Sequence, residues 1–423
     1  MKFHHTSIVG FLFVALLATA LPLTVFILQK QQQTQQQAAG TTPYVFGTLE
    51  TDPIHATAEK QAGLGAAMFT IGWDSAEPQD GVFNEGYIAQ MKQELQTFQQ
   101  VGMKVVLHFA LHYPPAWVFT YPNSKYINQN GTTAGEVNIV FNQTLRQKAE
   151  QFITHTAQEI GIQKAWAVRI NSGGDAEVLY PVENQNEYWA YDANAQNSIN
   201  LPPTIPHNPF PGWKPGQTTY NGQQMTTAQV AQWYQWYVGA LVDSVNWQIQ
   251  VYKNLGYQGY FQILTPGSGT RPSDYQTAMN NYLNGTGDAN QTMGRGAVWD
   301  KIYGGITDKT NVVAYISSVA DGSGNDDLCQ QTDSAYAITD PTLNNWSATR
   351  WISYIGKKYG MPINGENPGK PYYTNNGLMQ GQTIPLPSLS VVNGDIHNDN
   401  QLDIQDYNCL LYTSPSPRDR QKS

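Results

Sequence analysis

The chain has 423 residues, of which 40% are hydrophobic and 13% charged, and its formal net charge is −9. It has no basic stripe, which argues against nucleic acid as a partner, and its two cysteines exclude a disulfide framework. The length suits an α/β barrel of about 250 residues or more with insertions. Aromatic residues make up 12%, with 11 Trp and 25 Tyr, and they fit either a large core or a sugar-binding cleft.

The N-terminal segment contains an apolar run from Ile8 to Leu28 that is long enough to cross a bilayer. Ala18-Thr-Ala20 offers a small-residue cleavage site, but apolar residues continue past it. Residues 1–30 are therefore a signal peptide or, as we favour, an uncleaved signal anchor, and the Gln-rich residues 31–42 are a flexible linker. Both alternatives place the rest of the chain outside the cytoplasm, either secreted or anchored at the membrane.

Residues 43–385 alternate short apolar runs with amphipathic helical patterns, which is typical of βα units and a parallel sheet. We expect a (β/α)8 TIM barrel, although an eighth unit is not evident: Leu378–Ile384 is a weak strand candidate, and otherwise the last unit is lost. The seven predicted strands are Tyr44–Leu49, Ala66–Ile71, Lys104–Phe109, Ala165–Ile170, Gly259–Leu264, Asn311–Ser317 and Met361–Asn364.

Two of these strands lead into Gly-containing loops that carry carboxylates. Asp175 and Glu177 follow the fourth strand, and Glu366 follows the seventh. Carboxylates just past the carboxyl ends of barrel strands are where this fold keeps its chemistry. The structural alternatives are a salt bridge from Glu177 to Arg169 and a turn-capping role for Glu366.

Four strand-end motifs, in order along the chain, resemble those of glycoside hydrolases with (β/α)8 barrels. Trp73-Asp-Ser-Ala-Glu-Pro-Gln-Asp-Gly-Val-Phe83 and the Pro-Pro-Ala-Trp turn ending at Trp117 resemble family 42 β-galactosidases. Gly174-Asp-Ala-Glu-Val-Leu-Tyr-Pro181 and the Gly-Glu-Asn segment ending at Asn367 resemble family 14 β-amylases just as well. The resemblance covers roughly residues 44 to 369 and implies hydrolysis of O-glycosidic bonds.

The resemblance implies that Glu177 is the general acid and Glu366 the nucleophile or base, with no cofactor for catalysis. One carboxylic acid must protonate the leaving oxygen, and a second carboxylate attacks the anomeric carbon or activates water. The acid is expected to have a raised pKa. Family 42 places Asn directly before its acid, whereas this chain has Asp175-Ala-Glu177. Asn171 would take that place, or Asp175 would compete as the acid; we favour Glu177 because Val-Leu-Tyr-Pro follows it.

Other strand-end and insertion residues are expected to bind the sugar. His108 lies inside an apolar strand and is expected to be a core histidine, and Glu77 to hold a turn. The competing hypothesis is a non-catalytic carbohydrate-binding or scaffold protein with a degenerate barrel. The predicted substrate-binding residues are Asp74, His112, Trp117, Asn171, Asp175 and Asn367, with Trp213 and Trp299 as subsite walls.

Residues 386–408 form a linker and a loop with the acidic pattern of an EF-hand-type calcium site. The stretch resembles the first repeat of a dockerin, with His397 and Asn400 as departures. A complete dockerin has two such repeats and would imply a cohesin-type partner; the alternative is a solvated acidic linker. The expected Ca²⁺ ligands are Asp395, Asp399, Asp403 and Asp406, with the backbone carbonyl of Gln401.

Residues 409–423 have a different origin in our interpretation. The run Cys409-Leu-Leu-Tyr-Thr-Ser-Pro-Ser-Pro-Arg-Asp419 looks like the translation of a common transposase sequencing adapter. We therefore treat this segment as an artefact and exclude it from fold reasoning.

Overall fold

The computed structural model describes residues 45–174, 176–181, 186–267, 269–285, 292–317, 329–330 and 332–366, and the backbone of 411–413. The chain divides after Val45, and the fold described here belongs to the second unit, Phe46–Ser423. In the described ranges, no helix is both long and apolar enough to span a bilayer. The predicted anchor, Gln-rich linker and calcium loop all lie outside them.

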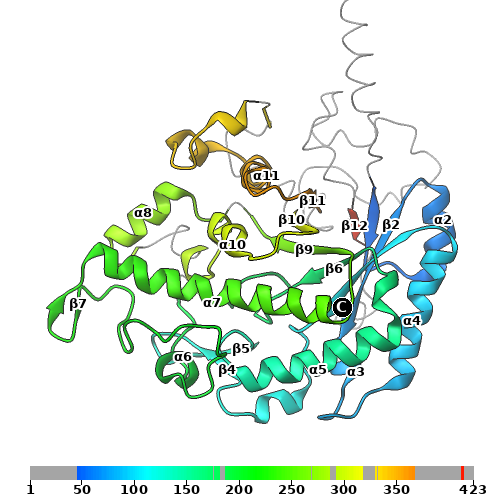
Figure 1. Ribbon diagram of the computed structural model, residues 1–423, viewed down its shortest axis with the longest axis horizontal. Coiled ribbons are helices and arrows are strands. Elements are labelled where there is room, and N and C mark those ends of the chain that lie inside the picture. Colours follow the sequence, from blue (N-terminus) through cyan, green and yellow to red (C-terminus); the bar gives the residue numbers. More distant parts are fainter. Residues whose placement is uncertain are drawn as a thin grey trace, which may run out of the picture. The chain divides into compact units, whose positions relative to one another are not determined.

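Eight parallel strands form one sheet, in the order β11-β10-β9-β6-β3-β2-β1-β12 (Figure 1). All seven predicted strands are found, with ends shifted by no more than a few residues. The neighbours follow the order of a (β/α)8 barrel, but over the described residues β11 and β12 are not paired, so the sheet curls as a half-barrel. The strands are β1 (Gly47–Leu49), β2 (Ala66–Gly72), β3 (Lys104–Ala110), β6 (Ala167–Ile170), β9 (Tyr260–Thr265), β10 (Val312–Ile316), β11 (Ile363–Gly365) and β12 (Leu411–Thr413).

The eighth strand differs from our expectation. Leu378–Ile384 lies outside the described residues, and the outer edge of β1 is paired in parallel by Leu411–Thr413 instead. These three residues belong to the segment that we excluded as an artefact. Leu-Tyr-Thr has strand propensity and fills the backbone hydrogen-bonding groups of an otherwise open edge. Excluding the segment by its origin therefore missed a strand position.

Helices follow most strands, and several begin at a side-chain cap. Asn84 caps α4, Asn142 caps α5, and Thr226 forms a capping box with Gln229 at the start of the long α7. The helices are α2 (Ala56–Gln61), α3 (Trp73–Ala76), α4 (Glu85–Gln100), α5 (Gln143–Ile160), α6 (Ala193–Asn197), α7 (Thr227–Asn254), α8 (Pro272–Asn280), α10 (Trp299–Gly305) and α11 (Ala348–Lys358).

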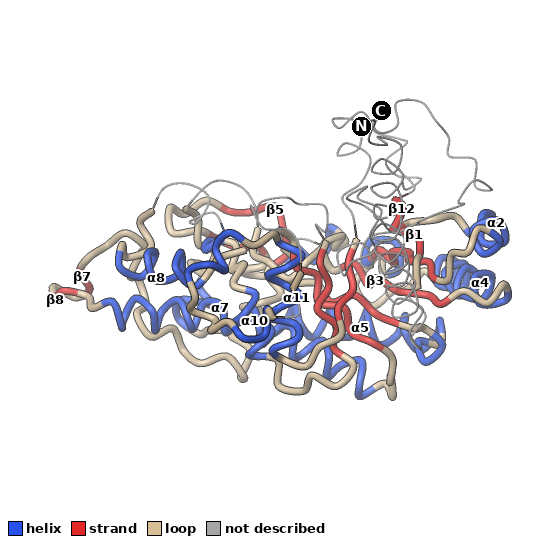
Figure 2. The backbone as a smooth tube through the Cα atoms, turned by 90° about the horizontal axis from the view of Figure 1, so that it is seen from above, coloured by secondary structure: helices blue, strands red, loops and turns tan. Residues whose placement is uncertain are grey.

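Shorter elements complete the described chain. Two small antiparallel hairpins pair β4 (Lys125–Ile127) with β5 (Thr133–Val137) and β7 (Thr219–Tyr220) with β8 (Gln223–Gln224). In Figure 2 the β7–β8 hairpin lies at the end of the molecule farthest from β1. Single 3-10 turns occur at η1 (Pro53–His55), η2 (Ala116–Thr120), η3 (Ile162–Lys164), η4 (Asp333–Ala335) and η5 (Pro341–Asn345).

The two faces of the sheet carry different side chains. Alternate residues such as Phe69, Phe109 and Ile263 join the large hydrophobic cluster with the helices. We call the opposite side the inner face. It has a small hydrophobic cluster of its own, formed by Leu49, Met68, Val106 and Ala167.

Beyond this small cluster the inner face becomes polar. Thr70 pairs with His108, His108 with Arg169, and Arg169 with Gln262, so four polar side chains lie in register across four strands. We call these four residues the polar row. The interior layers of a barrel are normally filled by branched apolar side chains, so a polar layer at this depth needs an explanation beyond packing.

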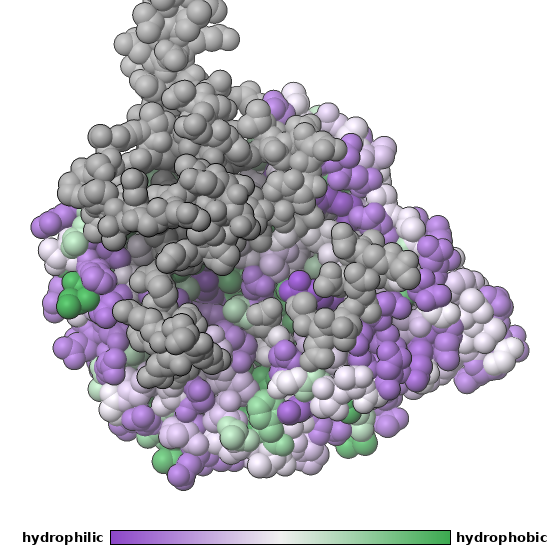
Figure 3. Space-filling model, turned by 180° about the vertical axis from the view of Figure 1, so that it is seen from behind, coloured by the Kyte–Doolittle hydropathy of each residue, from purple (hydrophilic) through white to green (hydrophobic). Residues whose placement is uncertain are grey.

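The outer surface gives no competing candidate on the side seen in Figure 3. Its described residues are mostly hydrophilic there, and hydrophobic residues form small separate patches. Scattered apolar residues of this kind are ordinary for a protein surface. The polar row therefore draws attention to the inner face rather than to the exterior.

Candidate active site

Glu366 directly follows β11 and is held by two side chains of the inner face. Arg169 of β6 forms an ion pair with its Oε2, and the Tyr315 hydroxyl of β10 donates to the same oxygen at 2.8 Å. The Glu366 backbone N–H also donates to Ile316 at 2.8 Å, which continues the β10–β11 pairing. The carboxylate is thus fixed at the carboxyl end of the sheet with its charge matched by a guanidinium.

Arg169 is buried, with 4% of its surface exposed, and its second contact is the Tyr315 hydroxyl at 2.7 Å. Burial alone would lower the pKa of this guanidinium, but Glu366 and Tyr315 reverse that effect and raise it. We had considered a structural salt bridge between Arg169 and Glu177. The arginine pairs with Glu366 instead, so it connects the predicted catalytic carboxylate to the polar row.

Glu177 reaches the same end of the sheet from the loop after β6. Its Oε1 accepts a hydrogen bond from the Ser317 hydroxyl at 2.7 Å. Ser317 and Tyr315 are two residues apart around the end of β10, which places them on the same side of the chain. Both glutamates are therefore tied to one side of β10, although they are far apart in sequence.

The loop that carries Glu177 is fixed by its own backbone contacts. Ser172 accepts from the Leu179 N–H at 2.9 Å and donates from its N–H to the Glu177 carbonyl at 3.0 Å. Gly173 adopts a φ of 75°, which favours glycine, and a Cβ there would lie 3.1 Å from Val137. The Gly-rich sequence thus allows a tight loop against β5.

Asn171 lies at the end of β6 and is almost fully buried. Its Nδ2 donates to the Phe109 carbonyl at 2.9 Å, and Gln248 of α7 donates to the Asn171 carbonyl at 2.5 Å. The asparagine therefore braces the strand end between β3 and α7. A direct contact with substrate is our expectation for Asn171; its Nδ2 is occupied within the protein, whereas its Oδ1 has no partner among the described residues.

His108 is a buried neutral histidine, in agreement with the sequence expectation. Burial, together with His112 and Arg169, lowers its pKa well below the usual value. Thr70 donates its one hydroxyl proton to Glu50, so Nδ1 of His108 must donate across the 3.5 Å contact to Thr70. Nε2 then accepts from Asn171 Nδ2 at 3.4 Å. These long contacts make a consistent chain of weak hydrogen bonds along the inner face.

Glu50 is a third carboxylate at this end of the sheet, which the sequence did not single out. It directly follows β1 and accepts from the Thr70 hydroxyl. Burial raises the pKa of Glu50, whereas the Thr70 hydrogen bond and the charge of Arg169 act in the opposite direction. The position of Glu50 just after a predicted strand was a usable signal. The alternation of side chains along that strand, however, predicts that Glu50 faces the helices.

Three polar atoms of the inner face have no hydrogen-bond partner among the described residues. They are Arg169 Nε, a donor, and Gln262 Oε1 and Asn171 Oδ1, both acceptors. Buried polar groups are nearly always paired with protein or ordered water. The polar row is therefore not self-sufficient, and it suits partners such as water or hydroxyl groups, which both donate and accept.

The loops after β2 and β3 place three predicted substrate-binding residues close together. The Asp74 N–H donates to the Tyr113 carbonyl at 3.0 Å, and the His112 ring stacks on His108 with centroids 5.1 Å apart. The Trp117 indole donates to the Glu77 carbonyl at 2.9 Å and is partly buried against the core. His112 thus borders the polar row and Asp74 is tied to the loop that carries His112, whereas the indole N–H of Trp117 is occupied within the protein.

Glu77 holds a turn, as the sequence predicts. The carboxylate is fully buried and accepts from the Trp73 indole at 2.8 Å and from the Gly81 N–H at 2.9 Å. Both contacts lie within the motif from Trp73 to Phe83. The motif is therefore a folding element of the loop after β2.

Trp213 and Trp299 require a correction. They are 1% and 0% exposed, and Trp213 packs edge-on against Trp233 of α7 with centroids 5.3 Å apart. The expectation that they form subsite walls does not fit this burial. The content of aromatic residues fits a large core or a sugar-binding cleft about equally, and these two rings belong to the core.

Several predicted site residues lie outside the described residues. In the parts of the chain that the structure describes, no three His, Cys, Asp or Glu side chains gather as metal ligands would. The predicted residues outside those parts are Asp175, Asn367 and the calcium-loop residues Asp395, Asp399, Gln401, Asp403 and Asp406.

Comparison with known proteins supports the fold. No family model matches the chain. The catalytic domain of β-amylase from Paenibacillus polymyxa is similar with a TM-score of 0.52 at 15% identity, covering 78% of this chain and 87% of that chain. A β-galactosidase from the psychrophilic Marinomonas ef1 is similar with a TM-score of 0.44 at 12% identity, covering 70% and 44%. The first likeness shows a shared fold; the second is too low to add to the argument.

Proposed function

We propose that this protein is a glycoside hydrolase that cleaves O-glycosidic bonds of oligo- or polysaccharides, with Glu177 as general acid and Glu366 as nucleophile or base. The observation that carries the proposal is the anchoring of both glutamates to one side of β10, through Ser317 and Tyr315. A fold shared with a β-amylase catalytic domain supports it. Such enzymes work with two carboxylates on either side of the scissile bond.

The contacts of the two glutamates suit different roles. Glu366 accepts from a guanidinium and a phenol, which fits a carboxylate that presents negative charge to an anomeric carbon or to water. Glu177 accepts from the neutral Ser317 hydroxyl, a contact that is compatible with a proton on the carboxyl.

The test is a pair of conservative variants, Glu177→Gln and Glu366→Gln, assayed on chromogenic α- and β-glycosides and on starch. We expect each to lower hydrolysis at least about a hundredfold, the usual contribution of a positioned acid or base. Glu159→Gln on the exposed side of α5 is the matched control and should leave hydrolysis unchanged. Full hydrolysis in both site variants would overturn the proposal. Sugar binding by the natural chain without any hydrolysis would favour a non-catalytic carbohydrate-binding protein.

We further propose that the protein works at the cell surface or outside the cell and binds Ca²⁺ at Asp395 to Asp406. The apolar run at the N-terminus and the spacing of the acidic residues support these two proposals. Calorimetric titration with Ca²⁺ should show one site that Asp395→Ala removes. A cohesin-type partner depends on a second repeat, which this sequence does not contain.

A further inference from the structure

Glu50 has an unusual backbone conformation immediately after β1. Its φ is 51°, in the left-handed region that side chains other than glycine rarely adopt. Its N–H donates to the Met68 carbonyl at 2.8 Å, so the residue is still tied to β2. Such an outlier is worth explaining, because the surrounding structure must hold it in place.

The neighbours of Glu50 show what this conformation achieves. Thr48 and Thr51 donate to Glu59 of α2 and so face the helices, whereas Leu49 joins the inner-face cluster. Regular alternation would turn Glu50 to the helix side with Thr48. Its side chain is on the inner face instead, where Thr70 donates to it. The left-handed turn therefore aims a carboxylate into the proposed active site.

The charged groups around Glu50 come from three other elements. Arg169 of β6 lowers the pKa of Glu50, and Glu366 after β11 raises it. Glu50 in turn raises the pKa of Arg169, and it raises that of Glu94 on α4. Thr70, which holds Glu50, is in register with His108, and His108 with Arg169, which contacts Glu366 directly.

We infer that Glu50 is a third carboxylate of the site, a positioning residue that shares the charge of Arg169 with Glu366. This inference rests on the proposed function, because it gives Glu366 the role of nucleophile or base. Glu50 is aimed into the site by its backbone and held there by Thr70. It is not assigned a contact with substrate.

The first test is the pH profile of kcat/KM for Glu50→Gln. In Glu50→Gln one negative charge of the site is lost, so Arg169 acts on Glu366 alone and the repulsion between the two carboxylates is removed. The acid limb of the pH profile should therefore move to lower pH by about one unit. Glu59→Gln is the matched control, because Glu59 also accepts from threonines beside β1 but on the helix side. It should leave the acid limb in place. An unchanged acid limb in Glu50→Gln would overturn the inference.

The second test needs no substrate. Unfolding midpoints of Glu50→Gln, Glu366→Gln and the double variant form a double-mutant cycle. We expect the double variant to be less stable than the sum of the single effects predicts, because it alone leaves Arg169 without a carboxylate. Additive midpoints would show that the two carboxylates do not interact, whatever the enzyme assay gives.

The two tests separate this inference from the proposed function. Full hydrolysis in Glu177→Gln and Glu366→Gln would overturn the proposed function, and non-additive midpoints would still support the coupling of Glu50 to Glu366. A second outcome is that hydrolysis is lost in those variants while the midpoints are additive and the acid limb of Glu50→Gln does not move. That outcome would overturn the inference about Glu50 but not the proposed function.

Discussion

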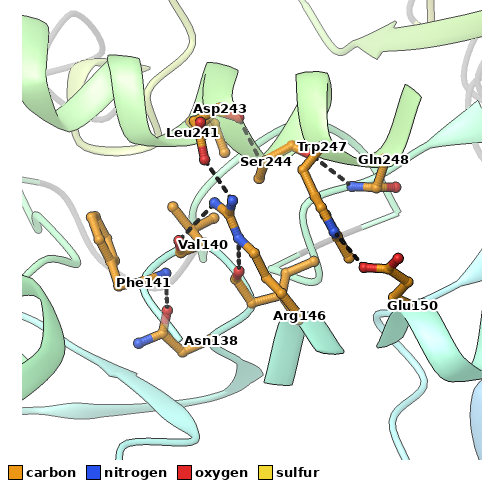
Figure 4. Close-up of polar contacts among 11 residues, drawn as sticks. Asn138, Val140, Phe141, Arg146, Glu150, Leu241, Asp243, Ser244, Trp247 and Gln248 are labelled. Carbon is orange, nitrogen blue, oxygen red and sulfur yellow. Dashed lines mark hydrogen bonds and ion pairs between the residues drawn. The ribbon is translucent and has the colours of Figure 1, made fainter. Parts of the chain in front are cut away.

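Two buried arginines serve different purposes in this protein. Arg146 lies between α5 and α7, where each of its nitrogens donates a hydrogen bond: to Ile139 and Val140 at 2.9 Å and to Asp243 at 2.5 Å (Figure 4). Arg169 on the inner face of the sheet contacts Glu366 and Tyr315, and its Nε has no partner among the described residues. Every nitrogen of Arg146 is therefore bonded within the fold, whereas Nε of Arg169 is not.

Their electrostatic surroundings also differ. Burial lowers the pKa of Arg146, which faces one carboxylate, Asp243. Burial also acts to lower the pKa of Arg169, but Glu366, Tyr315 and Glu50 together outweigh burial and raise it. Both remain charged, since an arginine is not deprotonated in proteins. A buried guanidinium with excess negative charge around it and a nitrogen without a partner indicates a site, whereas one with a single carboxylate and a bond from every nitrogen indicates a structural role.

The largest expected effect concerns the structural arginine. Arg146→Met should lower the free energy of unfolding by about 3–5 kcal/mol, because it leaves Asp243 without its partner and two carbonyls without donors. Chemical denaturation measures this loss. Hydrolysis per folded molecule should stay within about twofold of the natural chain, since no residue of the inner face changes. A much larger change in hydrolysis would break the distinction between the two arginines.

The functional arginine should show the reverse pattern. Arg169→Met should reduce kcat/KM at least about a hundredfold, which corresponds to about 2.7 kcal/mol of transition-state stabilisation. Arg169→Lys keeps the charge but loses the planar contact with Glu366 and Tyr315, so it should recover part of the activity. Steady-state kinetics on a substrate found in the glycoside screen measures both. Equal activity of Arg169→Met and the natural chain would contradict the assignment.

A smaller effect is expected from the backbone at Glu50. Glu50→Gly and Glu50→Ala both remove the carboxylate, but only glycine adopts a φ of 51° without strain. The glycine variant should be the more stable by about 1 kcal/mol, although glycine usually destabilises relative to alanine. Thermal unfolding of the two variants measures the difference. If alanine is the more stable, the left-handed conformation at this position is not strained.

The smallest effects distinguish the two faces of β9. Ile263 is fully buried on the helix side, and Ile263→Val should cost about 1 kcal/mol of stability without changing hydrolysis. Gln262→Leu on the inner face removes an acceptor that has no partner among the described residues, so stability should change by less than about 1 kcal/mol. Its kcat/KM should nevertheless fall severalfold. Unfolding and kinetics measured on both variants decide whether the faces differ as described.

Apolar periodicity was sufficient to predict the strands. All seven predicted strands are present, because runs such as Ala66–Ile71 and Lys104–Phe109 bury both faces of a parallel sheet. Strand-end reasoning also brought Glu177 and Glu366 to one end of the sheet. These predictions depend on local pattern and on the rule that parallel strands share a carboxyl edge.

The remaining features depend on tertiary structure. Arg169 and Glu366 form an ion pair although they are 197 residues apart in the sequence, and no local pattern predicts this contact. Glu50 departs from strand alternation through a single left-handed residue that is not a glycine. Trp213 lies in a long insertion and packs against Trp233 of α7, and Trp299 is the first residue of α10; no periodicity reveals that either ring is buried. Long-range pairing and irregular backbone therefore limit what the sequence predicts.

The order of the strands has a consequence for how this protein folds. The inner face joins residues from β1 to the residue after β11, so its contacts are strongly non-local. Closing such long loops is entropically costly and slows folding. Until β11 docks, Arg169 is a buried cation without its carboxylate. The acquisition of activity should therefore be among the last events in refolding, later than the recovery of helical circular dichroism.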